Sequence, residues 1–182
     1  MSRRCGFVAL IVALSILPQA GICDGLSKSK EYELKAAFVY NFTKFIEWPP
    51  HSFSTGNDPI IVGVLGDSAL GPQLEHLVRD RTVNGRSLVV TKVENLEGAR
   101  SAHVLFVGKG ELALFQNIRE GIQDSPILTV GESKAFAVRD GGITFVMENG
   151  VPRFEINMRP VDRAGLRISS QLQKLATIIF NG

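Results

Sequence analysis

A short polar segment, Gly66-Asp67-Ser68, follows an apolar run at residues 60–65 and is the first place where the sequence offers chemistry. A serine at the end of a buried strand can act as a nucleophile if a histidine accepts its proton. The three histidines, at 51, 76 and 103, include none near the carboxyl terminus, where an esterase of this arrangement has its base. We therefore interpret Gly66 and Asp67 as a tight turn and Ser68 as the cap of the next helix.

A second interpretation of this loop is a ligand site. Open α/β sheets accept ligands at the carboxyl ends of parallel strands, so a phosphate or other small anion at the helix start near Asp67 and Ser68 stays open. The glycines around the loop do not have the spacing of a dinucleotide-binding motif. The histidines are too far apart in sequence to form a recognisable metal motif, and His103, which opens a buried strand, is expected to be structural. We expect no catalytic residue, no metal and no cofactor.

Four cations lie near the carboxyl terminus. In a helix that begins near residue 160, Arg163, Arg167 and Lys174 form one band, and Arg159 stands just before it. Cations at a helix start oppose the helix dipole. Either nearby acids such as Glu155 neutralise these cations, or the cations contact an anionic ligand or partner.

The overall composition excludes several classes of protein. The 182 residues include 20 Lys and Arg against 18 Asp and Glu, and 45% of them are apolar. Disordered chains have few apolar residues and a high net charge, and nucleic-acid-binding proteins have a clear basic excess. The sequence therefore predicts a globular domain that does not bind nucleic acid.

The amino terminus is typical of a secretory signal peptide. Arg3 and Arg4 precede an apolar stretch at 7–17, and small residues follow up to Cys23, after which we predict cleavage. The stretch is about half of the ~20 residues that a membrane span needs, so no stable membrane insertion is expected after cleavage. A lipoprotein modified at Cys23 is the less favoured alternative, because Ile22 fits poorly before a modified cysteine. Residues 1–23 would be removed, and residues 24–182 would form one periplasmic domain.

Cleavage at this point changes the chemistry of the chain. The peptide contains both cysteines, Cys5 and Cys23, and the two arginines that account for the formal charge of +2. The mature chain is then neutral and free of cysteine, so it has no thiol chemistry. A neutral protein associates through shape and apolar patches more than through long-range electrostatic steering.

The first element that must position these residues is a helix at about 31–48, which ends before Pro49-Pro50. Leu34, Phe38, Phe45 and Trp48 form its apolar stripe. Asn41 falls on the same stripe, and we expect its amide to bond a neighbouring backbone group more readily than a ligand.

The remaining pattern alternates strands and helices. Continuous apolar runs at 60–65, 88–91, 104–107 and 127–130 are typical of parallel strands that are buried on both faces, and helical patterns lie between them. Asn149-Gly150 at the centre of 143–158 predicts an antiparallel edge hairpin. A final helix begins at about 160, with Ile168, Leu172, Leu175 and Ile179 as its buried stripe. The predicted fold is a layered α/β/α sandwich with a mostly parallel sheet.

Five separated blocks, at 35–49, 62–66, 141–146, 154–157 and 164–172, resemble the YfiR-like (HmsC-like) family of periplasmic proteins. They follow one another in order across nearly the whole predicted mature chain. Within them the residues that we interpret as signature packing positions are Phe38, Asn41, Phe45, Trp48, Asn157, Gly165 and Leu166.

The resemblance implies a regulator that is not an enzyme. Well-known members inhibit a membrane-bound diguanylate cyclase by binding its periplasmic sensory domain, which lowers cyclic di-GMP and biofilm formation, and they are typically homodimers. The resemblance thus implies as partner the periplasmic domain of such a cyclase or of a similar sensor. Those members contain disulfides, whereas the predicted mature chain has no cysteine, so it differs from them in any thiol-based redox sensing. A periplasmic module that binds an anion or nucleotide for a sensor or transporter is the alternative.

Overall fold

The computed structural model describes residues 23–66, 68–139 and 141–180. The predicted signal peptide, apart from Cys23, lies outside these ranges, and so does Asp67. The cleavage site and the domain boundary at residue 24 stay predictions.

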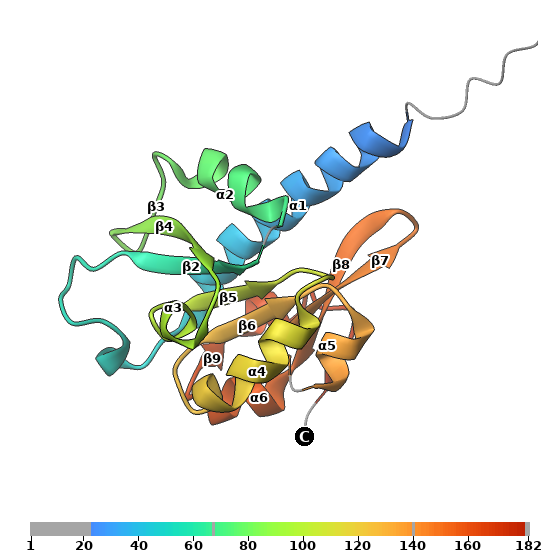
Figure 1. The fold of residues 1–182 in the computed structure, drawn as a ribbon. Coiled ribbons are helices and arrows are strands. Elements are labelled where there is room, and N and C mark those ends of the chain that lie inside the picture. Colours follow the sequence, from blue (N-terminus) through green and yellow to red (C-terminus); the bar gives the residue numbers. More distant parts are fainter. Residues whose placement is uncertain (1–22, 67, 140, 181–182) are drawn as a thin grey trace, which may run out of the picture.

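The centre of the fold is a mostly parallel sheet of eight strands (Figure 1), as the apolar runs predict. Their order is β10-β8-β7-β6-β5-β2-β4-β3. Strands β2, β4, β5, β6 and β7 run parallel, β8 is antiparallel to β7, and β3 is antiparallel to β4. The bounds are β2 Ile60–Leu65, β3 Thr82–Val83, β4 Arg86–Val93, β5 Val104–Val107, β6 Leu128–Gly131, β7 Ile143–Glu148, β8 Val151–Asn157 and β10 Ile179–Phe180.

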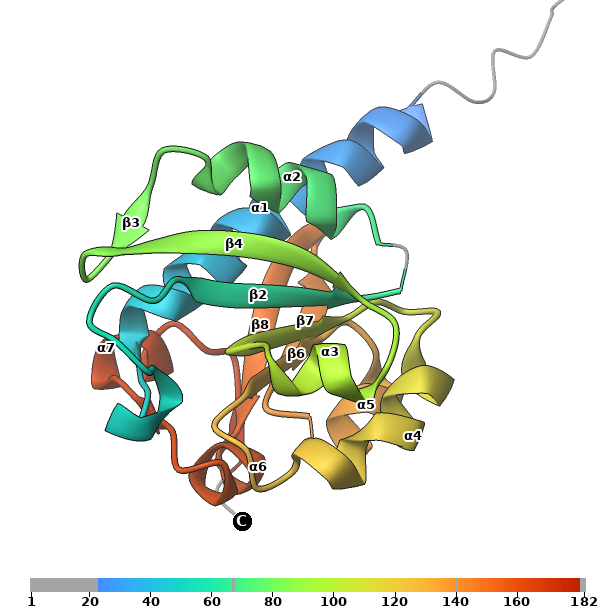
Figure 2. The same cartoon turned by 60° about the vertical axis from the view of Figure 1, so that its left-hand side comes forward.

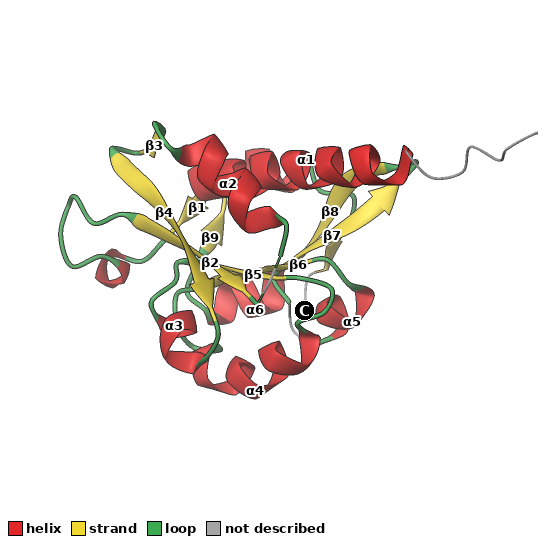
Figure 3. Ribbon diagram, turned by 45° about the horizontal axis from the view of Figure 1, so that its top comes forward, coloured by secondary structure: helices red, strands yellow, loops and turns green. Residues whose placement is uncertain are grey.

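Helices cover both faces of this sheet (Figure 3). Helices α1 (Cys23–Phe45) and α2 (Leu70–Val78) lie on one face, and α3 (Leu96–Arg100), α4 (Leu112–Ile122) and α5 (Lys134–Val138) lie on the other. Alternate residues of the central strands enter two separate cores: Val104 packs with the first group, and Leu105 packs with the second. A strand that is buried on both faces needs apolar side chains at every position, which explains the continuous runs. The α/β/α sandwich is confirmed.

The hairpin is also confirmed. Strands β7 and β8 are joined by Asn149 and Gly150, which have φ values of 51° and 76°. Both positive values match a type I′ turn, whose twist suits antiparallel strands. The two-residue strand β10 pairs with β8 on its outer side.

The predicted final helix is wrong. Its span divides into α6 (Met158–Arg163), β9 (Arg167–Ile168), α7 (Ser170–Gln173) and β10. Gly165 has a φ of 68°, a left-handed value that ends a helix and that glycine adopts without steric cost. The chain then extends so that β9 can pair with β1 (Ile46–Glu47), and the Ser169 hydroxyl accepts the Leu172 N–H to begin α7. Burial therefore continues at Ile168 and Leu172 but not at Leu175, which is exposed.

The predicted stripe of the first helix is only partly right. Phe38, Phe45 and Trp48 are partly buried and pack against the core, although Trp48 lies beyond the end of α1. Helix α1 rests on the sheet through Ala36, Val39 and Phe42, whereas Leu34 and Asn41 are exposed. The Asn41 amide therefore reaches water and needs no buried partner. The first turns of α1 extend past the sheet (Figures 1 and 2), so only the later part of the helix packs on the sheet.

His103 is a structural histidine, as expected. The Ile61 N–H donates to its Nδ1, and its Nε2 lies 3.0 Å from the Ser52 carbonyl oxygen, to which it donates. The imidazole also stacks on Phe53, with ring centroids 4.5 Å apart. These contacts hold the loop before β2 against the start of β5.

Protonation of His103 should weaken the fold. Burial lowers the pKa of His103 below its ordinary 6.5, because the charged ring loses solvation and a protonated Nδ1 can no longer accept the Ile61 N–H. The contribution of His103 to stability is then complete above pH 6.5 and is lost as the pH falls through the lowered pKa. Urea unfolding should show a loss of stability from pH 7.5 to pH 5 that is smaller in His103→Asn. The exposed His76→Asn is the control, and an equal loss in all three proteins would contradict the assignment.

Candidate functional site

The candidate site lies at the carboxyl ends of β2, β5 and β6. From β2 the chain crosses to β4 on one side and then returns to β5 on the other. Loops separate at such a topological switch point, and open α/β sheets bind ligands there. Gly66, Gly108 and Glu132 directly follow the three strands.

A cavity of about 300 Å³ is present between these loops and α1. One wall comes from the first half of α1, and the others come from the β2–α2 loop, the β5–α4 loop and the residue after β6. The lining residues are Lys28, Glu31, Tyr32, Ser68, Ala69, Gly108, Lys109, Gly110, Glu111 and Glu132.

A buried ion pair lies at the inner end of this cavity. The Lys35 ammonium donates to the carboxylates of Glu31 and Glu132. Side-chain exposure is 1% for Lys35, 2% for Glu132 and 21% for Glu31. Glu31 and Lys35 stand one helical turn apart on α1, whereas Glu132 comes from the end of β6. The pair therefore fixes α1 to the carboxyl edge of the sheet.

The Glu132 carboxylate also accepts two further hydrogen bonds. Its Oε1 accepts the Tyr32 hydroxyl at 3.0 Å and the Lys109 backbone N–H at 3.2 Å. Burial and then the Glu132 carboxylate raise the pKa of Tyr32 well above its ordinary value. The phenol is therefore a hydrogen-bond donor at any physiological pH.

A further carboxylate stands at the β2 loop. Gly66 has a φ of 69°, and a Cβ placed on it would lie 2.2 Å from the Glu111 carboxyl carbon. Only glycine allows Glu111 to approach the loop so closely. Glu31, Glu111 and Glu132 are the carboxylates of the cavity lining, and Lys28 and Lys109 are its ammonium groups. A carboxylate disfavours a nearby anion.

Of the predicted ligand loop, Ser68 lines this cavity, whereas Gly66 does not. The Ser68 hydroxyl accepts the Leu70 N–H at 3.3 Å, the helix-start role expected from the sequence. Asp67 lies outside the described residues.

The band of cations does not form, because no single helix presents it. Arg159 and Arg163 belong to α6, Arg167 belongs to β9, and Lys174 follows α7. Arg163 donates to the Gln123 carbonyl at 3.4 Å, and Arg167 stands opposite Glu47 in the β1–β9 pair. The four cations therefore come from α6, β9 and the residue after α7, and Glu155 lies on β8.

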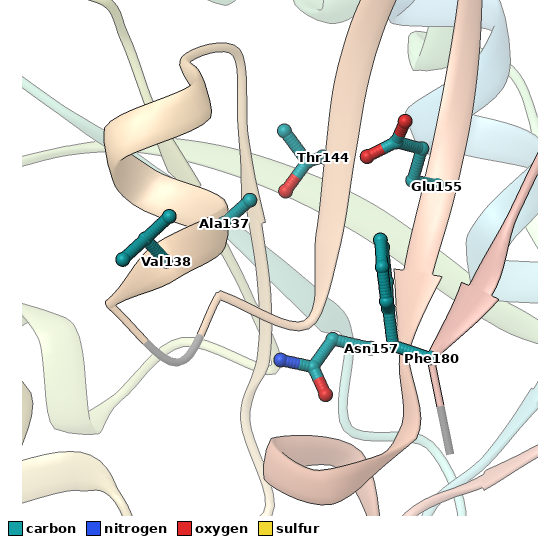
Figure 4. A pocket seen from close by; sticks show the side chains of 6 residues that line it. All are labelled: Ala137, Val138, Thr144, Glu155, Asn157 and Phe180. Atoms are coloured by element: carbon teal, nitrogen blue, oxygen red, sulfur yellow. The ribbon is translucent and has the colours of Figure 1, made fainter. Parts of the chain in front are cut away.

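Glu155 and Asn157 line a second pocket of about 260 Å³, which is shown in Figure 4. Thr144 and Glu155 are cross-strand neighbours on β7 and β8. The other lining residues are Ala137 and Val138 of α5 and Phe180 of β10. Val138 is 85% exposed and Phe180 is 48% exposed, so this apolar face is open to solvent.

The residues of the buried ion pair were missed by sequence reasoning. In the sequence, Lys35 and Tyr32 precede an apolar run and have the pattern of ordinary helix residues. Glu132 has the pattern of a polar residue that follows a strand. The available signal was the position of Glu132 at a carboxyl end, where ligand sites of α/β sheets lie.

The described part of the chain contains neither a metal-binding cluster nor a membrane-spanning helix. Residues 23–66, 68–139 and 141–180 contain no group of three His, Cys, Asp or Glu side chains placed to hold a metal ion. None of the helices within the same ranges is long and apolar enough to span a membrane.

Fold and site together define a class: an α/β sandwich with a polar cavity at the carboxyl ends of its parallel strands. Within that class, the chain belongs to the YfiR/HmsC-like family, whose model matches residues 32–177. The family resemblance of the five sequence blocks is thereby confirmed. No curated protein sequence matches the chain significantly.

Two solved structures are similar in fold. One is described as an ABC domain in complex with L-Trp from Streptococcus pneumonia, with a TM-score of 0.52 and 11% identity over 82% of this chain. The other is a conserved domain protein from Vibrio cholerae, with a TM-score of 0.51 and 10% identity over 81% of this chain. The chain spans only 60% of the length of each. At these identities the similarity shows the fold alone.

Breaking the buried ion pair on one side should be costly. Lys35→Met leaves the buried Glu132 carboxylate without its ammonium partner, and Glu132→Leu leaves Lys35 with only the partly exposed Glu31. Both changes should lower the free energy of unfolding, the first by about 3–5 kcal/mol. The double variant Lys35→Met with Glu132→Leu removes both charges and should be more stable than either single variant. Urea unfolding measures these differences, with the exposed Lys30→Met as the control. A double variant that loses the sum of the two single effects would contradict the coupling.

Proposed function

We propose that this protein is a periplasmic regulator, not an enzyme, that inhibits a membrane-bound signalling protein by direct contact. The proposed partner is the periplasmic domain of a diguanylate cyclase or a similar sensor, so the activity lowers cyclic di-GMP and biofilm formation. The observation that carries this proposal is the family match, which extends over residues 32–177. The family resemblance also implies a homodimer, so we propose that the protein acts as a homodimer.

The apolar face of Figure 4 supports a contact function. Val138 and Phe180 are large apolar side chains that line one pocket and remain open to solvent. Such side chains gain free energy when a partner covers them, and a few anchors of this kind dominate most interfaces. The exposed cations Arg159, Arg163, Arg167 and Lys174 are proposed as additional partner contacts.

A partner test follows from this face. Cross-linking in intact cells should capture an inner-membrane protein with a cyclase domain, and deletion of the regulator should raise cyclic di-GMP several-fold. Val138→Asp with Phe180→Asp should weaken capture by tenfold or more, because the charges must be desolvated on contact. The exposed apolar Leu34→Asp on α1 is the matched control. Unchanged cyclic di-GMP in the deletion, with no membrane protein captured, would contradict the proposal.

Export is tested independently. Alkaline phosphatase, which is active only in an oxidising compartment, should be active when fused after residue 30. Replacing Arg3 and Arg4 by Glu should lower the activity of the fusion, because the basic amino-terminal region of a signal peptide would be lost. An inactive fusion with the native sequence would contradict the periplasmic location.

The alternative function is a small-molecule binding module that serves a sensor or transporter. The observation that favours it is the cavity at the topological switch point. One of the proteins similar in fold is described with bound L-Trp, which is a property of that protein. The carboxylates of Glu31, Glu111 and Glu132 count against the anion or nucleotide that the sequence suggested, because they would repel it. The predicted cations come from α6, β9 and the residue after α7, so they do not form the band of one helix.

A further inference from the structure

The cavity beneath α1 contains charges that packing alone does not require. Transferring an ion from water to a protein interior costs several kcal/mol, and apolar side chains of similar volume are often at least as stable. Nevertheless Lys35 and Glu132 are almost fully buried, and the Glu132 carboxylate lines a cavity of about 300 Å³. A cavity at a topological switch point is where open α/β sheets bind ligands, and a few polar groups in such a cavity fix the ligand's orientation.

The charges within this cavity are unequal. One buried ammonium, Lys35, is shared by the two carboxylates of Glu31 and Glu132. Glu111, from the β5–α4 loop, adds a third carboxylate, which packs against Gly66. The less exposed charged groups at the cavity are therefore three carboxylates and one ammonium, and the phenol of Tyr32 is held protonated beside them. A positively charged group that enters the cavity would be attracted by these carboxylates.

The outer end of the cavity has the opposite character. Lys28 and Lys109 line it, and both side chains are exposed to solvent. Solvent screens their effect on the interior, but they favour an anionic group on the part of a ligand that faces outward. A ligand that fits both ends therefore has an ammonium group that faces the carboxylates, and it can also have an acid group that faces Lys28 and Lys109.

We propose that this cavity binds a small molecule through an ammonium group, which Glu31 and Glu111 contact while Tyr32 forms the adjoining wall. This inference goes beyond the proposed contact function and does not depend on it, because the cavity and the face of Figure 4 share no lining residue.

The proposal is tested by calorimetry on the purified exported protein with three probes of similar size. Phenethylamine has only an ammonium group, phenylalanine has an ammonium and a carboxylate, and 3-phenylpropionate has only a carboxylate. We expect the two ammonium compounds to bind and 3-phenylpropionate to bind at least tenfold more weakly. Tighter binding of phenylalanine assigns the amino-acid type of ligand, and equal or tighter binding of phenethylamine assigns the simple amine.

Two variants locate the binding. Glu111→Gln and Glu31→Gln each remove one negative charge from a partly exposed side chain and should weaken phenethylamine at least tenfold. Glu120→Gln, an exposed carboxylate on the same helix α4, is the control and should leave binding unchanged. Urea unfolding of each variant separates lost binding from lost folding.

Three results would overturn the inference: binding of 3-phenylpropionate as tight as that of phenethylamine, no binding of either ammonium compound at millimolar concentration, or unchanged binding in a folded Glu111→Gln. Cross-linking of Glu111→Gln to its membrane partner keeps the two proposals apart. If partner capture persists while no probe binds, only the ligand site is wrong. If ligand binds but no partner is captured, the contact function is wrong.

Discussion

The ion pair of Lys35 and Glu132 is the interaction on which the arrangement of this molecule depends. It joins α1 to the end of β6 across 97 residues of sequence, in an environment where neither charge is stable alone. The same placement of α1 sets the Phe42 ring 5.0 Å from Phe154 in the core below. One polar contact and one aromatic cluster therefore fix the same helix, and the cavity wall formed by Glu31 and Tyr32 follows from that position.

The family signature residues have mostly structural roles. Leu166 is buried, Gly165 has the positive φ that ends α6, and Asn157 accepts the Arg159 N–H at the start of α6. Phe38 packs against the core aromatics. Nothing in the described structure explains Asn41, which is exposed. A signature made of packing and capping residues identifies a fold, and the ligand and partner must be inferred from other residues.

The strands and the hairpin could be predicted because their causes are local. A strand buried on both faces is apolar throughout, and Asn149-Gly150 adopts the positive φ angles of its turn without a partner. The carboxyl-terminal segment could not be predicted in this way, because Ile168 pairs with Ile46, which is distant in sequence. The candidate site was missed for the same reason. Lys35 and Glu132 have ordinary local surroundings, and only the fold reveals that each is the buried partner of the other.

The segment after β6 connects the cavity to the apolar face. Glu132 lies at the cavity, and Ala137 and Val138 of α5 lie at the face, so one short helix separates the two. Ligand binding alters such a helix only if the helix has two positions with different affinities. Here Ser133 caps α5, and Phe136 is fully buried with its ring 5.0 Å from Phe115. These contacts anchor α5 at its start and at its centre, which favours a ligand site and a contact face that act independently.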